Sequence, residues 1–252
     1  MSKKSDQQFT ELLETAKTDP NIIGFFLGGS RGKGFENELS DYDPLMIVND
    51  EMIDAYKKKY EDMKFEDIDL SVISLSNFKT YAEWGSSEEW DRYDFSHVQV
   101  QVDKNGEIQK IVNEKGVIPD DKRDNFVRWS IDSYINHVFR SVKCIRNKNK
   151  TGARLAAYES IPNFLNVIFA LEGRIKPFND YLEKELEQFP LKKLPIKRVD
   201  LLEKILAIIN SADLSTQQNL LKMVEDVSRK EGFGQTFDDW EGKDKWAMEF
   251  RP

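Results

Sequence analysis

Short apolar runs separated by turn-forming residues dominate the N-terminal part of the chain. Two such runs, at 22–27 and 44–49, flank a glycine-rich stretch, and their length and boundaries predict buried β-strands. Apolar residues at helical spacing predict one helix at about 5–20, opened by a Ser5–Gln8 capping box, and another at 51–63. The order helix, strand, loop, strand, helix is therefore expected before residue 64.

Two further segments alternate between apolar and polar residues. The first, at 68–72, surrounds Asp69 and predicts another strand. In the second, valines alternate with glutamines from 98 to 102, the turn DKNG follows, and EIQKIV occupies 107–112. This pattern predicts a β-hairpin over 98–112.

The pattern changes to a helical period after Pro119. Helices are expected at about 121–147, from 153 to 173 with a break or restart at Pro162, and at 178–188, 197–210 and 216–230, the last opened by Ser215 and Gln218. Both patterns stop in the segment EKGVIPDDK at 114–122. We therefore expect a first domain at 1–117 that contains the strands and a helical domain at 118–252.

Candidate chemistry concentrates between the first two strands. Gly28, Gly29, Gly32 and Gly34 let backbone N–H groups approach an anion closely, and Ser30 and Arg31 add side-chain donors. Asp41 and Asp43 precede the second strand and, two residues apart in an extended chain, are expected on one face. A phosphate-binding loop beside two carboxylates is the combination that a nucleoside triphosphate needs when it is bound as its magnesium complex.

The spacing of the glycines excludes two common phosphate-binding motifs. A Walker-type loop requires Lys and then Ser or Thr after the second glycine, but Phe35 follows Gly34. A dinucleotide fingerprint requires a third glycine where the chain has Asn37.

The stretch resembles the signature of the DNA polymerase beta-like nucleotidyltransferase superfamily. That signature is a Gly-Ser pair, here Gly29 and Ser30, a spacer of about ten residues, and an Asp-x-Asp element, here Asp41 to Asp43. The superfamily also uses a third carboxylate on a neighbouring strand. Asp69 matches it best because it lies inside the apolar alternation, and Asp67 is the rival.

The chain looks most similar to the bacterial branch that includes the aminoglycoside and lincosamide nucleotidyltransferases. The resemblance covers residues 21–75 and implies an α+β (α/β) fold, in which a polymerase beta-like catalytic domain with a mixed sheet at 1–117 precedes a helical bundle at 118–252. It implies that Asp41, Asp43 and Asp69 are catalytic and bind Mg²⁺.

The resemblance also implies that Gly29, Ser30 and Arg31 bind the phosphates of ATP or another nucleoside triphosphate. The expected reaction is transfer of a nucleoside monophosphate, with AMP favoured, to a hydroxyl of a small molecule such as an antibiotic. Asp69 or a carboxylate of the second domain, such as Glu159, would take the proton of that hydroxyl.

Composition narrows the alternatives. The chain has 252 residues, 39% apolar and 33% charged, which is typical of a globular protein. A net charge of −8 disfavours nucleic acid as the main partner, and the single cysteine, Cys144, excludes an internal disulfide. No apolar run approaches the ~20 residues of a membrane span, so we expect no membrane association and a cytoplasmic location. A protein or RNA acceptor, or a non-catalytic nucleotide-binding module, stays open.

The segment YAEWGSSEEWDRYDF at 81–95 combines aromatic and acidic residues. It predicts either a rim for a cationic acceptor, built from aromatic faces and carboxylates, or a loop whose tryptophans fill a small core of their own. The pattern alone does not separate these two interpretations.

Overall fold

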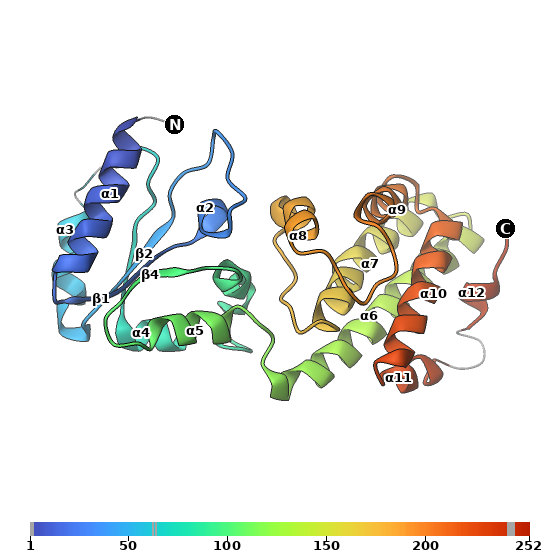
Figure 1. Cartoon of the computed structure of the whole chain (residues 1–252). Helices are drawn as coiled ribbons and strands as arrows, with labels where there is room; N and C mark the ends of the chain where they lie inside the picture. The colour runs from blue at the N-terminus through green and yellow to red at the C-terminus, as the bar shows by residue number, and fades with distance from the viewer. Residues whose placement is uncertain (1–2, 62, 64, 241–244) are drawn as a thin grey trace. The chain divides into compact units, whose positions relative to one another are not determined.

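The computed structural model describes residues 3–61, 63, 65–240 and 245–252. Its backbone forms two compact units, Met1–Val117 and Ile118–Pro252. Figure 1 shows the strands in the first unit and a helical second unit.

The first unit contains a four-stranded mixed sheet in the order β3-β2-β1-β4. Strand β1 (Ile22–Leu27) lies between β2 (Pro44–Val48) and β4 (Val100–Asp103) and is antiparallel to both. Strand β3 (Ser71–Ser74) is parallel to β2. The predicted α+β class, with a mixed sheet followed by a helical region, is confirmed.

Helices cover both faces of this sheet (Figure 1). Helices α1 (Lys3–Thr18) and α3 (Ile53–Glu61) pack on one face, over Phe25 and Met46. Helices α4 (Leu75–Thr80) and α5 (Ile108–Lys115) and the 3₁₀ helix η2 (Glu89–Phe95) cover the other, over Phe26 and Ile47. Neighbouring residues of each strand thus enter different cores, as the two-residue period of a strand requires. A short 3₁₀ turn, η1 (Asp50–Met52), leads into α3.

The predicted hairpin at 98–112 is wrong, because residues 108–115 form α5. Ile108 and Val112, four residues apart, are fully buried on the sheet, which matches a helical period. Asp103 starts the helix by accepting hydrogen bonds from the backbone amides of Gly106 and Gln109. The turn was identified correctly, but it leads into a helix and not into a returning strand.

The second unit consists of helices. The two longest, α6 (Asp120–Arg146) and α7 (Lys150–Ala170), pack together, with the rings of Tyr134 and Phe164 5.5 Å apart. The remaining elements are η3 (Asn179–Tyr181), α8 (Leu182–Gln188), α9 (Arg198–Ser211), α10 (Leu214–Lys230), α11 (Gly234–Asp238) and α12 (Trp246–Glu249). Within the described residues, no helix combines the length and apolar character that a membrane span requires.

Three helix boundaries differ from the prediction. Helix α7 continues through Pro162, because Ile161 and Phe164 are buried on either side of the proline and their packing offsets a cost of about 3 kcal/mol. Helix α10 is capped by Asp213, whose carboxylate accepts a hydrogen bond from the amide of Thr216, and not by Ser215. Helix α1 begins at Lys3, before the predicted capping residue Ser5, and Ser5 is a buried residue within the helix.

Candidate active site

The acidic pair lies where strand β2 begins. An isolated bridge between Tyr42 and Ile68 extends the β2–β3 pairing past the ends of both strands. The Tyr42 ring stacks on Phe9 of α1 at 4.5 Å, so Tyr42 faces the α1 side of the sheet. By alternation, Asp41 and Asp43 face the opposite side, toward η2.

The same bridge positions the third carboxylate. The amide of Asp69 donates to the carbonyl of Tyr42 at 2.8 Å, and the amide of Tyr42 donates to the carbonyl of Asp67 at 3.0 Å. Asp67 has a positive φ of 57°, and its carboxylate accepts a hydrogen bond from Ser5 of α1. Asp69 is exposed, as Asp67 is, but it lies close enough to Asp43 for its negative charge to raise the pKa of the Asp43 carboxyl.

Asp43 is the electrostatic centre of the group. Burial and, after it, the negative charges of Asp41, Asp94 and Asp69 together raise the pKa of its carboxyl to about 6, and the positive charge of Lys33 opposes the shift. The structure therefore brings the three predicted aspartates into one electrostatic group and adds Asp94. Such a strongly perturbed carboxylate is a mark of functional sites.

The glycine-rich stretch packs directly against Asp43. It forms a single short helix, α2 (Gly29–Lys33), where a loop was predicted. The amide of Gly28 donates to the carbonyl of Asp43 at 2.8 Å. Gly29 has φ of 55°, and a Cβ atom at this position would lie 1.9 Å from the Asp43 carboxylate. Only glycine meets both requirements, so position 29 is fixed by the acidic site.

Arg31 and Ser30 occupy the same helix. The Arg31 guanidinium donates through Nε and Nη2 to the carbonyl of Ser40 and lies 4.4 Å from the centre of the Tyr42 ring. These contacts anchor the loop that precedes Asp41. Ser30 is partly exposed, and its carbonyl accepts the amide of Phe35. Phosphate binding by Gly29, Ser30 and Arg31 stays a prediction.

Two residues of the group, Asp94 and Lys33, were not predicted from the sequence. Asp94 lies at the end of η2, and its carboxylate would be 3.2 Å from a Cβ added to Gly28. The Lys33 amine donates to the Asp94 carbonyl at 2.6 Å and lies 3.5 Å from the Asp94 carboxylate. A lysine inside the glycine-rich stretch is a sequence signal that could have identified Lys33. Asp94 carries no such signal, because only the fold brings η2 to the site.

The acidic and aromatic segment at 81–95 is held in place by buried residues other than Trp90. Tyr93 is fully buried, and buried Arg92 donates to the carbonyls of Ala82, Glu114 and Val117. Trp90, however, is 69% exposed. The segment is thus anchored in the core and still presents an aromatic ring, and its role as a rim stays a prediction.

The donor chemistry fits Mg²⁺, although the carboxylates do not converge on one point. In the described part of the chain, no three His, Cys, Asp or Glu side chains are arranged to hold a metal ion by themselves. Mg²⁺ is usually held by one or two carboxylates together with substrate phosphates and water, so a complete protein cage is not required. Asp43 with Asp41 or Asp69 would supply such a pair, and metal binding by these residues stays a prediction.

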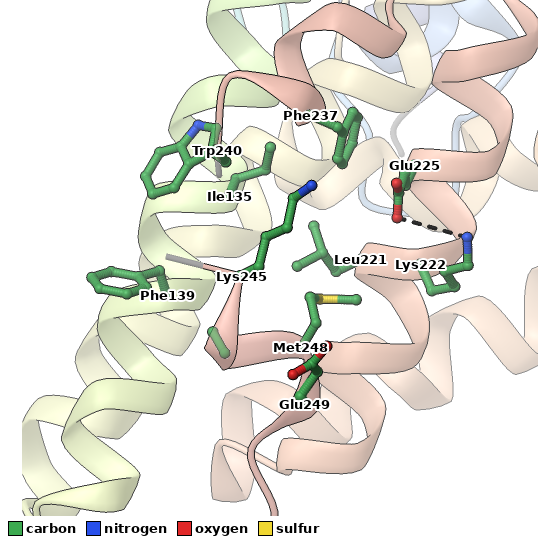
Figure 2. Close-up of a pocket in the computed structure, with 11 residues that line it drawn as sticks. Ile135, Phe139, Leu221, Lys222, Glu225, Phe237, Trp240, Lys245, Met248 and Glu249 are labelled. Atoms are coloured by element: carbon green, nitrogen blue, oxygen red, sulfur yellow. Dashed lines mark ion pairs between the residues drawn. The ribbon is translucent and has the colours of Figure 1, made fainter. Parts of the chain in front are cut away.

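A pocket of about 270 Å³ lies in the second unit, between α6, α10, α11 and α12 (Figure 2). Its walls include Phe139, Phe237 and Trp240. Lys222 on its edge pairs with Glu225 at 3.7 Å and with Asp226 at 2.6 Å. None of the predicted site residues lines this pocket, so the candidate active site is the acidic group of the first unit.

Comparison with known proteins does not assign this chain to a family. No family model matches the chain, and no curated protein matches it. Among solved structures, a nucleotidyltransferase-like protein from Exiguobacterium sibiricum 255-15 is similar over 94% of this chain and 78% of its own, with 10% identity and a TM-score of 0.43. This similarity does not distinguish the aminoglycoside or lincosamide branch from others. At this level of similarity, the function has to be argued from the chain's own residues.

Proposed function

We propose that this chain is a Mg²⁺-dependent nucleotidyltransferase that transfers a nucleoside monophosphate, with AMP favoured, from a nucleoside triphosphate to a hydroxyl of a small molecule. One observation carries the proposal: Asp43 is desolvated between the glycine turn and three other carboxylates, and its pKa is raised to about 6. Lys33 offsets only part of this negative charge, so the group is unfavourable for the fold alone, and a divalent cation would relieve it.

Asp43, together with Asp41 or Asp69, would hold the metal, and the triphosphate and water would complete its ligands. When bound, Mg²⁺ neutralises charge on the triphosphate and on the oxygens of the reacting phosphorus. The helix start at Gly29 and Ser30 lies beside Asp43, and its first backbone N–H groups have no intrahelical acceptor. We assign the β- and γ-phosphates to these donors.

In the reaction, the acceptor oxygen forms a bond to the α-phosphorus, the bond from that phosphorus to the bridging oxygen breaks, and pyrophosphate leaves. The hydroxyl proton passes to a carboxylate. Asp69 is suited to accept it because its side chain is exposed at the edge of the group. The chain's main contribution is to place these groups and to hold their charges in fixed positions.

For the acceptor, we favour a cationic small molecule of the aminoglycoside or lincosamide type. The exposed ring of Trp90 and the carboxylate of Asp91 belong to η2, the helix that also carries Asp94. Aromatic faces and carboxylates together bind ammonium groups. The net charge of −8 disfavours an RNA acceptor.

The test is incubation of the protein with labelled ATP or other nucleoside triphosphates, Mg²⁺, and separate panels of antibiotics, proteins and RNA. We expect pyrophosphate release and label transfer to a small molecule, both abolished by Asp43→Asn. Label on a protein or an RNA would show that this macromolecule, and not a small molecule, is the acceptor. Nucleotide binding without turnover in any panel would identify a non-catalytic module.

A further inference from the structure

Lys33 is a buried cation directly behind the acidic group. Its side chain has 0% exposure, although lysine is almost never fully buried unless it is paired. The amine donates to the Asp94 carbonyl at 2.6 Å, lies 3.5 Å from the Asp94 carboxylate, and stands 5.3 Å from the centre of the Tyr93 ring. These contacts fix the position of the ammonium group.

The charge of Lys33 acts beyond its bonded partner. It opposes the upward pKa shift that burial and the neighbouring carboxylates impose on Asp43. It also acts in the same direction on Asp91, which lies one turn of η2 before Asp94. One buried ammonium group therefore faces several carboxylates that otherwise repel each other.

Lys33 cannot contact a nucleotide in this structure, because none of its side chain reaches the surface. A phosphate-binding lysine has to expose its amine to the ligand. Any effect of Lys33 on the reaction must therefore pass through the residues that it touches or polarises.

We propose that Lys33 is a positioning residue, a resident counter-charge that keeps Asp43 and Asp94 in place while no metal ion is bound. Lys33 bonds to Asp94 at the end of η2 and belongs to α2, whose first residue, Gly29, packs against Asp43. The contact between Lys33 and Asp94 thus links α2 to η2 beside the acidic group. Only the predicted effect of Lys33 on Mg²⁺ binding rests on the proposed function.

The proposal predicts a specific electrostatic coupling in the metal-free protein. Lys33→Met keeps most of the apolar stem and removes the charge, so it should lower the midpoint of urea unfolding at pH 8 in EDTA. In an Asp43→Asn background, where one repelling charge is gone, the same substitution should lower the midpoint by less than half as much. An equal loss in both backgrounds would show that Lys33 only packs and bonds to the Asp94 carbonyl, and would overturn the proposal.

A matched control is available in the same unit. Lys115 is also buried, and its amine donates to the carbonyls of Lys79 and Tyr81, away from the acidic group. Lys115→Met should lower the midpoint equally in both backgrounds. Lys33→Arg, which keeps the charge, should retain the coupling. If Lys33→Met does not fold, Lys33→Gln removes the charge and keeps a donor for the Asp94 carbonyl.

Addition of Mg²⁺ alone separates this proposal from the proposed function. If the carboxylates bind Mg²⁺, the Mg²⁺ concentration that gives half of the maximal thermal stabilisation should be at least threefold lower for Lys33→Met than for the wild-type protein. The reason is that the substitution removes a competing cation. An unchanged midpoint would refute the counter-charge role. If the wild-type protein does not respond to Mg²⁺ at all, the metal site fails, and the unfolding experiment in EDTA still decides the role of Lys33.

Discussion

The substitution Asp43→Asn tests the acidic site in the metal-free protein. The pKa of Asp43 is raised to about 6, so the folded state holds its proton more tightly than the unfolded state does. The stability associated with this proton is present below about pH 4 and is lost as the pH rises through about 6. At pH 8 the wild-type protein therefore carries the full penalty of an ionised Asp43.

The size of this penalty follows from the shift. A rise from the ordinary value of 3.8 to about 6 corresponds to about 3 kcal/mol at 1.36 kcal/mol per pH unit. The side chain is only half-buried, so screening by solvent makes this figure an upper limit, and we expect a penalty of about 1–3 kcal/mol. Asp43→Asn should stabilise the metal-free protein by this amount at pH 8 and have little effect at pH 4. Each kcal/mol moves the melting temperature of a unit of this size by about 4 °C.

Differential scanning calorimetry of the full chain in EDTA, at both pH values, measures the effect. Asp54→Asn, on the exposed surface of α3, is the control and should leave the melting temperature unchanged at both pH values. In parallel, Asp43→Asn should abolish pyrophosphate release and any stabilisation by Mg²⁺. A variant that melts lower at pH 8 yet still transfers nucleotide would show that Asp43 serves only the turn before Pro44, and would refute the catalytic interpretation of residues 28–48.

Three further predictions concern the glycine turn and the nucleotide. Isothermal titration calorimetry should show binding of a nucleoside triphosphate that requires a divalent ion, and equal affinity in excess chelator would contradict the magnesium site. Ser30→Ala should weaken nucleotide use by about 1.5–3 kcal/mol, the value of one hydrogen bond to a charged group. Complete loss of turnover in a folded Ser30→Ala protein would indicate an unassigned role. Gly29→Ala should displace Asp43, because its Cβ would lie 1.9 Å from the carboxylate, and should abolish nucleotide binding. Gly85→Ala, with φ of 86° and no atom within 4 Å of the added Cβ, should cost about 1–3 kcal/mol of stability and leave binding intact.

The part of the site that the sequence predicts is the part made by neighbouring segments. Gly29 and Asp43 belong to segments joined through two adjacent antiparallel strands, so a local strand–turn–strand pattern is enough to bring them together. Asp69 requires one further step, the parallel pairing of β2 and β3. The alternation at 68–72 predicts a strand there, and only the family resemblance implied that this strand neighbours the one that Asp43 precedes. Its rival, Asp67, differs by a positive φ and a bond to Ser5, which no periodicity reveals.

The parts that were missed depend on tertiary packing. Residues 107–112 alternate too weakly to distinguish a strand from a helix, and burial of Ile108 and Val112 against the sheet decides for the helix. Asp94 reaches the acidic group because Tyr93 and Phe95, on either side of it, are buried in the core. A short 3₁₀ helix with two such anchors has no sequence period long enough to recognise.

The magnitudes also separate the role of the metal in the reaction from any role in folding. Ionised Asp43 costs about 1–3 kcal/mol, whereas native domains are stable by about 5–15 kcal/mol. The strands that carry the site contribute Phe25, Met46 and Ile47, each with 0% exposure, and burial of each such side chain is worth about 1.5–3 kcal/mol. This penalty already includes the effect of Lys33, which offsets part of the negative charge. The first unit should therefore remain folded without a divalent ion, so a metal-free protein that has lost activity and kept its sheet is the expected state, and activity should return when the ion is restored.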